Sequence, residues 1–265
     1  MTEGRANRLS GSVVLVGGGP GSEGLLTVSA VEALAGADVV FFDRLAPHEN
    51  LATLAPRAEL INVGKRPGHH AIGQREIETA MIERARGGAR VVRLKGGDPY
   101  VFGRGSEEVI ACRAAGIPVS VISGVTSAVS VPASVGIPLT HRGLSHLFTV
   151  VSGHAPLTDT ELESLAKLGG TIVVLMGIGT LPQLIQGLQR WGASAELPVA
   201  IIENGFSDSQ KTTISSLGAT LWDAARAGVN SPAVIVIGEV VRLAHDGDQA
   251  AAVKLAEVGL LASHR

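Results

Sequence analysis

The sequence predicts an α/β protein of two domains, each built from a sheet with helices packed on it. Three observations support this fold class. Short β-branched apolar runs alternate with amphipathic helical patterns, glycine-rich turns separate the two, and the alternation restarts after residue 143. A length of 265 residues also fits two ordinary domains.

The first half of the chain repeats the order strand, glycine turn, helix, strand, which is typical of parallel α/β units. An apolar run at 12–16 is stopped by the glycine-rich turn 17–21, and a helical pattern follows from Leu25. The expected strands are 12–16, 38–43, 89–94 and 118–122, and the expected helices are 25–35, 72–86 and 106–115.

The second half resumes the pattern after a cluster of proline, glycine and basic residues, which places a domain junction near 138–144. The expected strands are 147–152, 171–176, 199–203 and 233–237, and the expected helices are 161–167, 181–191 and 220–226. The predicted organisation is a tail over 1–10, domains over 11–140 and 144–244, and an alanine-rich, helical tail over 245–265.

Composition excludes several functional classes. The chain is 45% apolar and 17% charged, so it can bury a core. A net charge of −2 and 3% aromatic residues argue against nucleic-acid binding. Neither a signal peptide nor an apolar run long enough to cross a membrane is present, so a cytoplasmic protein is expected.

The eight histidines lack metal-ligand spacing, and no metal is predicted. Cys112, the one cysteine, is expected to be a small apolar residue rather than a catalytic thiol.

Ligands of open α/β sheets bind at the carboxyl ends of the strands, so the loops that follow the strands locate the site. These loops hold most of the glycines and many of the unusual polar residues. They span residues 17–24, 43–45, 64–70, 95–105, 123–127, 153–156, 176–180 and 204–208.

The first glycine loop matches the dinucleotide pattern G-x-G-x-x-G at residues 19–24, with Asp43 about twenty residues later. Pro20, however, lacks the backbone N–H that a pyrophosphate cradle uses. A nicotinamide-dependent dehydrogenase is therefore the alternative of a different class. Calorimetry with NADH would test this alternative.

The segment 93–105 is more specific. Gly96 and Gly97 let the backbone approach a ligand closely, and Asp98 adds a carboxylate next to Pro99. A carboxylate and backbone carbonyls suit an ammonium or sulfonium group better than a phosphate. A tight turn with a solvated aspartate would explain the first five residues of this loop, but not the second glycine pair around Arg104.

Charged residues in neighbouring loops suggest acid–base chemistry on an acidic ligand. Taken alone, Asp43 and Lys65 are each interpreted as a solvated charge in a loop. Together they could accept and donate a proton. Basic residues are enriched in or beside these loops, which favours a polycarboxylate ligand over scattered surface charge. They are Arg44, Lys65, Arg66, Arg93, Lys95, Arg104 and Arg142.

These residues are together similar to the tetrapyrrole methylase family over about 12–242, nearly the whole chain. The Gly-Lys-Arg segment at 64–66 and the Thr-His-Arg-Gly segment at 140–143 favour the branch that acts on uroporphyrinogen III. The matching segments are 16–21, 25–27, 64–66, 94–105, 124–128, 136–143, 176–177 and 232–241.

The resemblance implies a two-domain α/β homodimer that binds S-adenosylmethionine in the cleft between its domains. Its matching donor-binding positions are Pro20, Gly96, Gly97, Asp98, Val101, Thr126, Ser127, Met176 and Gly205. The match to the family is weakest at Ser127, because a small residue of either polarity fits that position. The matching catalytic positions are Asp43 and Lys65 as the acid–base pair, with Arg104 near the substrate.

The implied reaction is the methylation of uroporphyrinogen III at C2 and C7, giving precorrin-2 via precorrin-1 in sirohaem or cobalamin biosynthesis. Some members carry a further dehydrogenase and ferrochelatase module, and methylation alone is expected here. Another precorrin methyltransferase of the same family is the closest alternative. A non-catalytic sensor that keeps the ligand loops without turnover is a third possibility.

Overall fold

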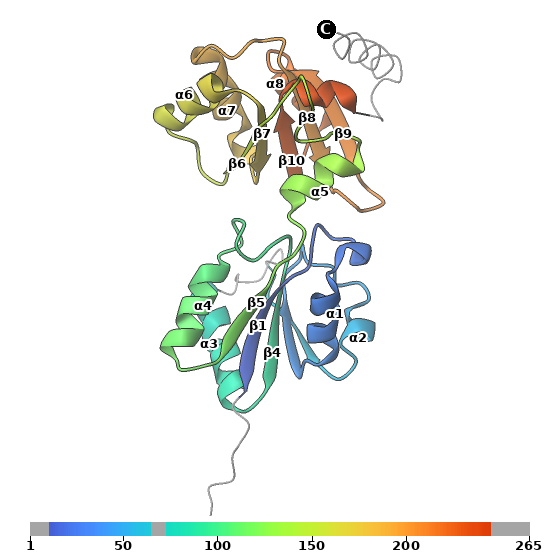
Figure 1. The fold of residues 1–265 in the computed structure, drawn as a ribbon, viewed down its shortest axis with the longest axis vertical. Coiled ribbons are helices and arrows are strands. Elements are labelled where there is room, and N and C mark those ends of the chain that lie inside the picture. Colours follow the sequence, from blue (N-terminus) through green and yellow to red (C-terminus); the bar gives the residue numbers. More distant parts are fainter. Residues whose placement is uncertain (1–10, 65–72, 245–265) are drawn as a thin grey trace, which may run out of the picture. The chain divides into compact units, whose positions relative to one another are not determined.

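The computed structural model describes residues 11–64 and 73–244, in two compact units that divide between Thr126 and Ser127. Each unit has one sheet with helices on both faces (Figure 1). The prediction of two α/β domains is therefore confirmed. The expected tails over 1–10 and 245–265 lie outside the described residues.

The first unit contains five parallel strands in the order β3-β2-β4-β1-β5. The strands are β1 (Ser12–Gly17), β2 (Val39–Phe42), β3 (Glu59–Asn62), β4 (Arg90–Lys95) and β5 (Val119–Ile122). The helices are α1 (Val28–Ala35), α2 (Leu51–Leu54), α3 (Gln74–Arg86) and α4 (Gly105–Ala114). Because the strands are parallel, all five end at one edge of the sheet, where ligand loops are expected.

Alternation along β4 assigns its side chains to the two faces of this sheet. Val92 and Leu94 pack with apolar residues of α1 and α2. Val91 packs with α3 and α4, and Arg93 and Lys95 point to that same side. Two basic side chains are therefore buried beneath α3 and α4, at the end of the strand that carries the Gly-Gly-Asp loop.

The second unit contains a mixed sheet in the order β6-β7-β10-β8-β9. Only β6 and β7 run parallel, since β10 is antiparallel to both β7 and β8, and β8 is antiparallel to β9. The strands are β6 (Phe148–Ser152), β7 (Thr171–Leu175), β8 (Pro198–Glu203), β9 (Lys211–Ser216) and β10 (Ala233–Ile237). The helices are α5 (Ser127–Ser134), α6 (Asp159–Leu168), α7 (Leu181–Arg190) and α8 (Thr220–Ala227).

The division between the units lies earlier than the sequence predicts. The proline–glycine cluster at 138–144 suggested the junction, whereas residues from Ser127 onward already belong to the second unit. The reason is packing: α5 and the segment after it bury Val131, Val135 and Ile137 against Val173 and Val234 of the second sheet.

Candidate active site

Two loops at the carboxyl edge of the first sheet are joined through their backbones. The N–H of Gly19 donates to the carbonyl of Gly97 at 3.1 Å, and the N–H of Gly97 donates to the carbonyl of Gly19 at 2.6 Å. The N–H of Gly18 also donates to the carbonyl of Lys95 at 2.7 Å. The loops after β1 and β4 therefore form one continuous backbone surface.

Glycines are required here because backbone packs directly on backbone. A Cβ atom on Gly124 would lie 2.3 Å from the carbonyl oxygen of Gly97, and one on Gly17 would lie 2.3 Å from the nitrogen of Gly124. Gly97 itself has a φ of 67°, a left-handed conformation that favours glycine. The ends of β1, β4 and β5 can meet this closely only without side chains.

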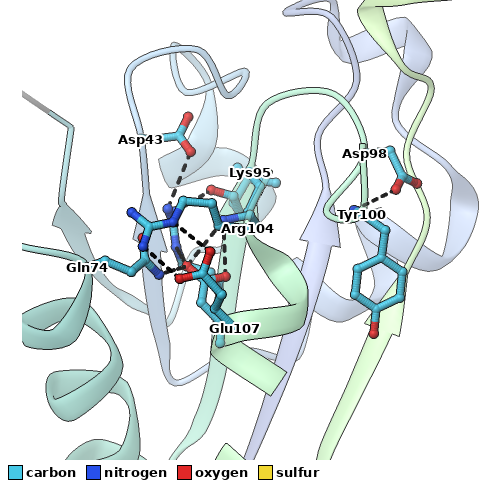
Figure 2. A network of polar contacts seen from close by, with 10 residues as sticks. Asp43, Gln74, Lys95, Asp98, Tyr100, Arg104 and Glu107 are labelled. Atoms are coloured by element: carbon cyan, nitrogen blue, oxygen red, sulfur yellow. Dashed lines mark hydrogen bonds and ion pairs between the residues drawn. The ribbon is translucent and has the colours of Figure 1, made fainter. Parts of the chain in front are cut away.

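Asp98 links the loop after β4 to the loop after β5. One carboxylate oxygen accepts the N–H of Tyr100 at 2.8 Å, and the other accepts the N–H of Gly124 at 3.0 Å. The contact with Tyr100 can be followed in Figure 2. A carboxylate oxygen can accept more than one hydrogen bond. The sequence predicts a carboxylate held by Pro99, and the structure shows that two backbone amides hold it.

The loop that follows Asp98 turns back over Pro99. The N–H of Gly105 donates to the carbonyl of Pro99 at 2.9 Å. Cβ atoms on Gly103 and Gly105 would lie 2.8 and 2.5 Å from that carbonyl oxygen. The glycine pair around Arg104 is therefore explained by close packing, and Arg104 itself adopts a φ of 58° at the start of α4.

Arg104 is exposed and forms a paired contact with Glu107, at 2.9 Å from Nε and 2.7 Å from Nη2. Glu107 raises the pKa of the Arg104 guanidinium through this contact. Exposed ion pairs contribute little to stability, about 0–1 kcal/mol. Arg104 can therefore exchange Glu107 for a carboxylate of a ligand at low cost.

Asp43 follows β2 and is held at three points. One oxygen accepts the N–H groups of Leu45 and Ala46 at 3.2 and 3.1 Å, and the other lies 3.4 Å from Nη2 of Arg93. Its side chain is 29% exposed, so it still reaches solvent. The structure thus fixes this carboxylate while leaving it accessible to a ligand.

A buried charge cluster lies next to Asp43, beneath α3 and α4. Glu108 of α4 is fully buried and lies 3.2 Å from Nε of Arg93 and 3.0 Å from Nζ of Lys95. Gln74 of α3 donates to the same carboxylate at 3.1 Å. The residues labelled in this view are Asp43, Gln74, Lys95, Asp98, Tyr100, Arg104 and Glu107 (Figure 2).

The buried position of Lys95 shifts its pKa. Burial and the nearby Arg93 lower the pKa of the Lys95 ammonium, and Glu108 and Asp43 oppose this shift. Glu108 was not predicted from the sequence. A signal was present in β4, where Arg93 and Lys95 lie two positions apart in the buried part of the strand and require a buried carboxylate.

The basic residues expected to hold a polycarboxylate fall into two groups. Arg93 and Lys95 are buried and paired with Glu108, so they do not face a ligand. Arg44, Arg104 and Arg142 are exposed. Lys65 and Arg66, including the proposed acid–base partner of Asp43, lie outside the described residues.

The glycine pattern at 19–24 lacks the helix that directly follows the loop in dinucleotide-binding proteins. The helix predicted from Leu25 begins only at Val28, after a 3₁₀ turn over Glu23–Leu25. The hydroxyl of Thr27 caps α1 by accepting the N–H of Ala30 at 3.2 Å. The glycine loop therefore does not lead directly into the helix N-terminus that a pyrophosphate would use.

The remaining donor-binding candidates lie at the unit boundary and in the second unit. Thr126 ends the first unit and Ser127 begins α5. Met176 follows β7 with a φ of 57° and is 47% exposed. A Cβ atom on Gly205 would lie 2.7 Å from a methyl group of Val131. Close packing against Val131 is thus one reason for a glycine at position 205.

Cys112 is completely buried in α4. Burial, together with the charges of Glu108 and Glu78, raises the pKa of its thiol to about 11. Because the thiolate is the reactive form, we expect no alkylation by iodoacetamide in the folded protein and one alkylation per chain after unfolding in guanidinium. Mass spectrometry measures both, and rapid labelling of the folded protein would contradict this assignment.

A search of residues 11–64 and 73–244 finds no group of three or more histidine, cysteine, aspartate or glutamate residues that could hold a metal ion. Within the same residues, no helix is long and apolar enough to cross a membrane.

Known proteins are similar to this chain in sequence and in fold. The family model of tetrapyrrole (corrin/porphyrin) methylases matches residues 12–220. The S-adenosyl-L-methionine-dependent uroporphyrinogen III methyltransferase of Methanosarcina barkeri is 43% identical over 240 residues, which is 89% of this chain and 94% of that protein. The uroporphyrinogen-III C-methyltransferase of Methanocaldococcus jannaschii is 45% identical over 238 residues, 89% and 98% of the two chains.

A solved structure is similar over almost the same extent. It is the uroporphyrin-III C-methyl transferase of Thermus thermophilus in complex with S-adenyl homocysteine, which has a TM-score of 0.72 and 40% sequence identity. The match covers 88% of this chain and all (100%) of that one. The chain therefore belongs to the tetrapyrrole methylase family.

Proposed function

We propose that this chain transfers two methyl groups from S-adenosylmethionine to C2 and C7 of uroporphyrinogen III, giving precorrin-2 via precorrin-1. The observation that carries this proposal is identity of 43 and 45% to two uroporphyrinogen III methyltransferases, over 94 and 98% of their lengths. The chain is thus an S-adenosylmethionine-dependent methyltransferase.

The first unit supplies most of the proposed donor site. The loops after β1 and β4 are joined through Gly19 and Gly97, and Asp98 connects the second of them to Gly124. The carboxylate oxygens of Asp98 can accept further hydrogen bonds, and their negative charge suits a positively charged methyl donor. The proposed contacts in this unit are Pro20, Gly96, Gly97, Asp98, Val101 and Thr126. Ser127, Met176 and Gly205 are the proposed contacts of the second unit.

Exposed apolar side chains beside these loops suit a flat macrocycle. Leu45 is 53% exposed, Tyr100 58% and Phe102 44%. Exposed apolar side chains that form one contiguous patch commonly mark a binding surface. We therefore place the tetrapyrrole on this surface, with Arg104 contacting one of its carboxylates.

The chemistry requires alignment of the two substrates and removal of a proton. An electron-rich pyrrole carbon attacks the sulfonium methyl group, the new carbon–carbon bond forms as the carbon–sulfur bond breaks, and S-adenosylhomocysteine leaves with the electron pair. Alignment of this kind contributes about 7–11 kcal/mol. Asp43 then removes a proton to restore the neutral macrocycle. Lys65 donates a proton or binds a propionate.

The direct test is incubation of the protein with methyl-labelled S-adenosylmethionine and uroporphyrinogen III under anaerobic conditions. We expect transfer of label to the tetrapyrrole, with heat-inactivated protein as the control. Absence of turnover, or binding of NADH in place of S-adenosylmethionine in calorimetry, would overturn the proposal.

Replacing Asp98 by Ala removes two charge-assisted hydrogen bonds, from Tyr100 and Gly124. Bonds of this kind contribute about 1.5–3 kcal/mol each, so we expect donor affinity to fall roughly 10- to 100-fold. Titration calorimetry with S-adenosylhomocysteine measures this loss. Asp159→Ala, which removes an exposed carboxylate on α6, is the control and should bind as the unchanged protein does. Unaltered affinity of Asp98→Ala would remove Asp98 from the donor site.

We also propose that the chain forms a homodimer, as the family resemblance implies, and that it is cytoplasmic, as its composition suggests. Sedimentation equilibrium tests the association, and a monomer at micromolar concentration would contradict it.

A further inference from the structure

Glu108 is a buried charged residue that the proposed reaction does not use. It is fully buried, and its carboxylate contacts Arg93, Lys95 and Gln74 at 3.0–3.2 Å. A buried carboxylate is costly unless it is paired and hydrogen-bonded. Here it compensates two buried cations that β4 places side by side. Glu108 is therefore necessary for Arg93 and Lys95 to remain where they are.

Arg93 connects Glu108 to Asp43. Its Nε faces Glu108 at 3.2 Å, its Nη1 donates to the carbonyl of Leu94 at 2.9 Å, and its Nη2 faces Asp43 at 3.4 Å. The guanidinium is planar and rigid, so a displacement at Nε moves Nη2 as well. The position of the Asp43 side chain thus depends on a carboxylate on the far side of Arg93.

The arrangement also balances charge. Arg93 and Lys95 carry two positive charges, and Glu108 and Asp43 carry two negative ones. Without Glu108, both cations would compete for Asp43, which is the only other carboxylate that the described residues place in an ion pair with Arg93. Asp43 would then be drawn towards the buried cations and away from a substrate.

We propose that Glu108 is a positioning residue that acts through Arg93 to hold Asp43 in the orientation needed for proton removal. The proposal rests on the proposed function, in which Asp43 is the base. It distinguishes Glu108 from residues that only stabilise the fold, because its effect on turnover must pass through Asp43.

The test is a double-mutant cycle of Glu108→Gln and Asp43→Asn. Gln keeps the shape and one acceptor oxygen but removes the charge. We expect Glu108→Gln alone to lower kcat roughly 10- to 100-fold, as small misplacements of catalytic groups do, and to leave the Kd for S-adenosylhomocysteine unchanged. In the Asp43→Asn background the same change should lower kcat no further.

Glu59→Gln is the matched control, because it removes a carboxylate paired with Arg84 on the surface of the same unit. Its kcat should equal that of the unchanged protein. Should Glu108→Gln fail to fold, Lys95→Met is compared with Lys95→Met/Glu108→Gln, which removes one buried cation together with the carboxylate. The kcat of the double variant is expected to be roughly 10- to 100-fold lower than that of Lys95→Met alone.

Independent, additive losses from Glu108→Gln and Asp43→Asn would overturn the proposal, as would wild-type kcat in a folded Glu108→Gln variant. Absence of methylation by the unchanged protein would instead overturn the proposed function. In that case the energetic coupling between Glu108 and Asp43 is measured from the free energies of unfolding in urea of the same single and double variants. Coupling between the two sites is expected, and strict additivity of their unfolding free energies would contradict it.

Discussion

Replacing Asp43 by Asn is expected to lower kcat for methylation of uroporphyrinogen III by about 10²- to 10⁴-fold, the usual contribution of a general base. Asn keeps an oxygen that can accept the N–H groups of Leu45 and Ala46. It loses the charge that faces Arg93 and the ability to remove a proton. Single-turnover kinetics with labelled donor measure the effect.

A matched control lies at the other end of the same strand. Asp38 precedes β2, and its exposed carboxylate accepts the N–H of Arg90 at 2.8 Å. Asp38→Asn should retain full kcat, and Asp43→Asn should bind S-adenosylhomocysteine as tightly as the unchanged protein. A kcat for Asp43→Asn within about twofold of the unchanged protein would exclude Asp43 as the base.

Gly124→Ala is expected to disrupt the donor site and to destabilise the first unit. The added Cβ would lie 2.3 Å from the carbonyl oxygen of Gly97 and 2.6 Å from the carbonyl carbon of Gly17. Both neighbours are backbone atoms held by hydrogen bonds, Gly17 at the end of β1 and Gly97 in the loop paired with Gly19, so neither can move alone. Overpacking costs about 1–3 kcal/mol or more, and we expect donor affinity to fall by a factor of roughly 10 to 100. Urea unfolding and calorimetry measure the two effects.

Gly36→Ala provides the comparison. Its Cβ would meet its nearest neighbour at 3.5 Å, an ordinary contact, and Gly36 has a φ of −89° that alanine also adopts. This variant should keep both its stability and its donor affinity. Equal behaviour of the two alanine variants would contradict the close backbone packing at the carboxyl edge.

The fold class followed from the sequence because strands with strong apolar runs were recognisable one by one. β10 was predicted at its observed bounds, and α3 and α7 within two residues of theirs. β3 and β9 were missed, since only the two central residues of β3 are apolar and β9 is mostly threonine and serine. α5 was missed because it contains Pro132, a residue that usually ends a helix.

Strand direction in the second unit could not be predicted. β10 comes last in the chain yet lies between β7 and β8 and runs antiparallel to both. Its sequence gives no sign of its neighbours, because a buried strand reads as an apolar run in either direction.

The candidate site could be predicted only in part. Asp43 and Asp98 were recognisable because each follows a strand in a loop where ligands bind. Glu108 was not, because it lies in a helix, and only the fold shows that it contacts Arg93 and Lys95 of the preceding strand. Gly103 and Gly105 illustrate the opposite limit, since close packing on Pro99 accounts for a glycine pair whose reason the sequence alone does not show.

The central claim is tested most directly by the structure of the product. The protein is supplied with ¹³C-methyl S-adenosylmethionine and uroporphyrinogen III, and the tetrapyrrole is analysed by mass spectrometry and NMR. We expect two labelled methyl groups, at C2 and C7, and two molecules of S-adenosylhomocysteine for each tetrapyrrole converted. Label at any other ring position, or none at all, would contradict the account.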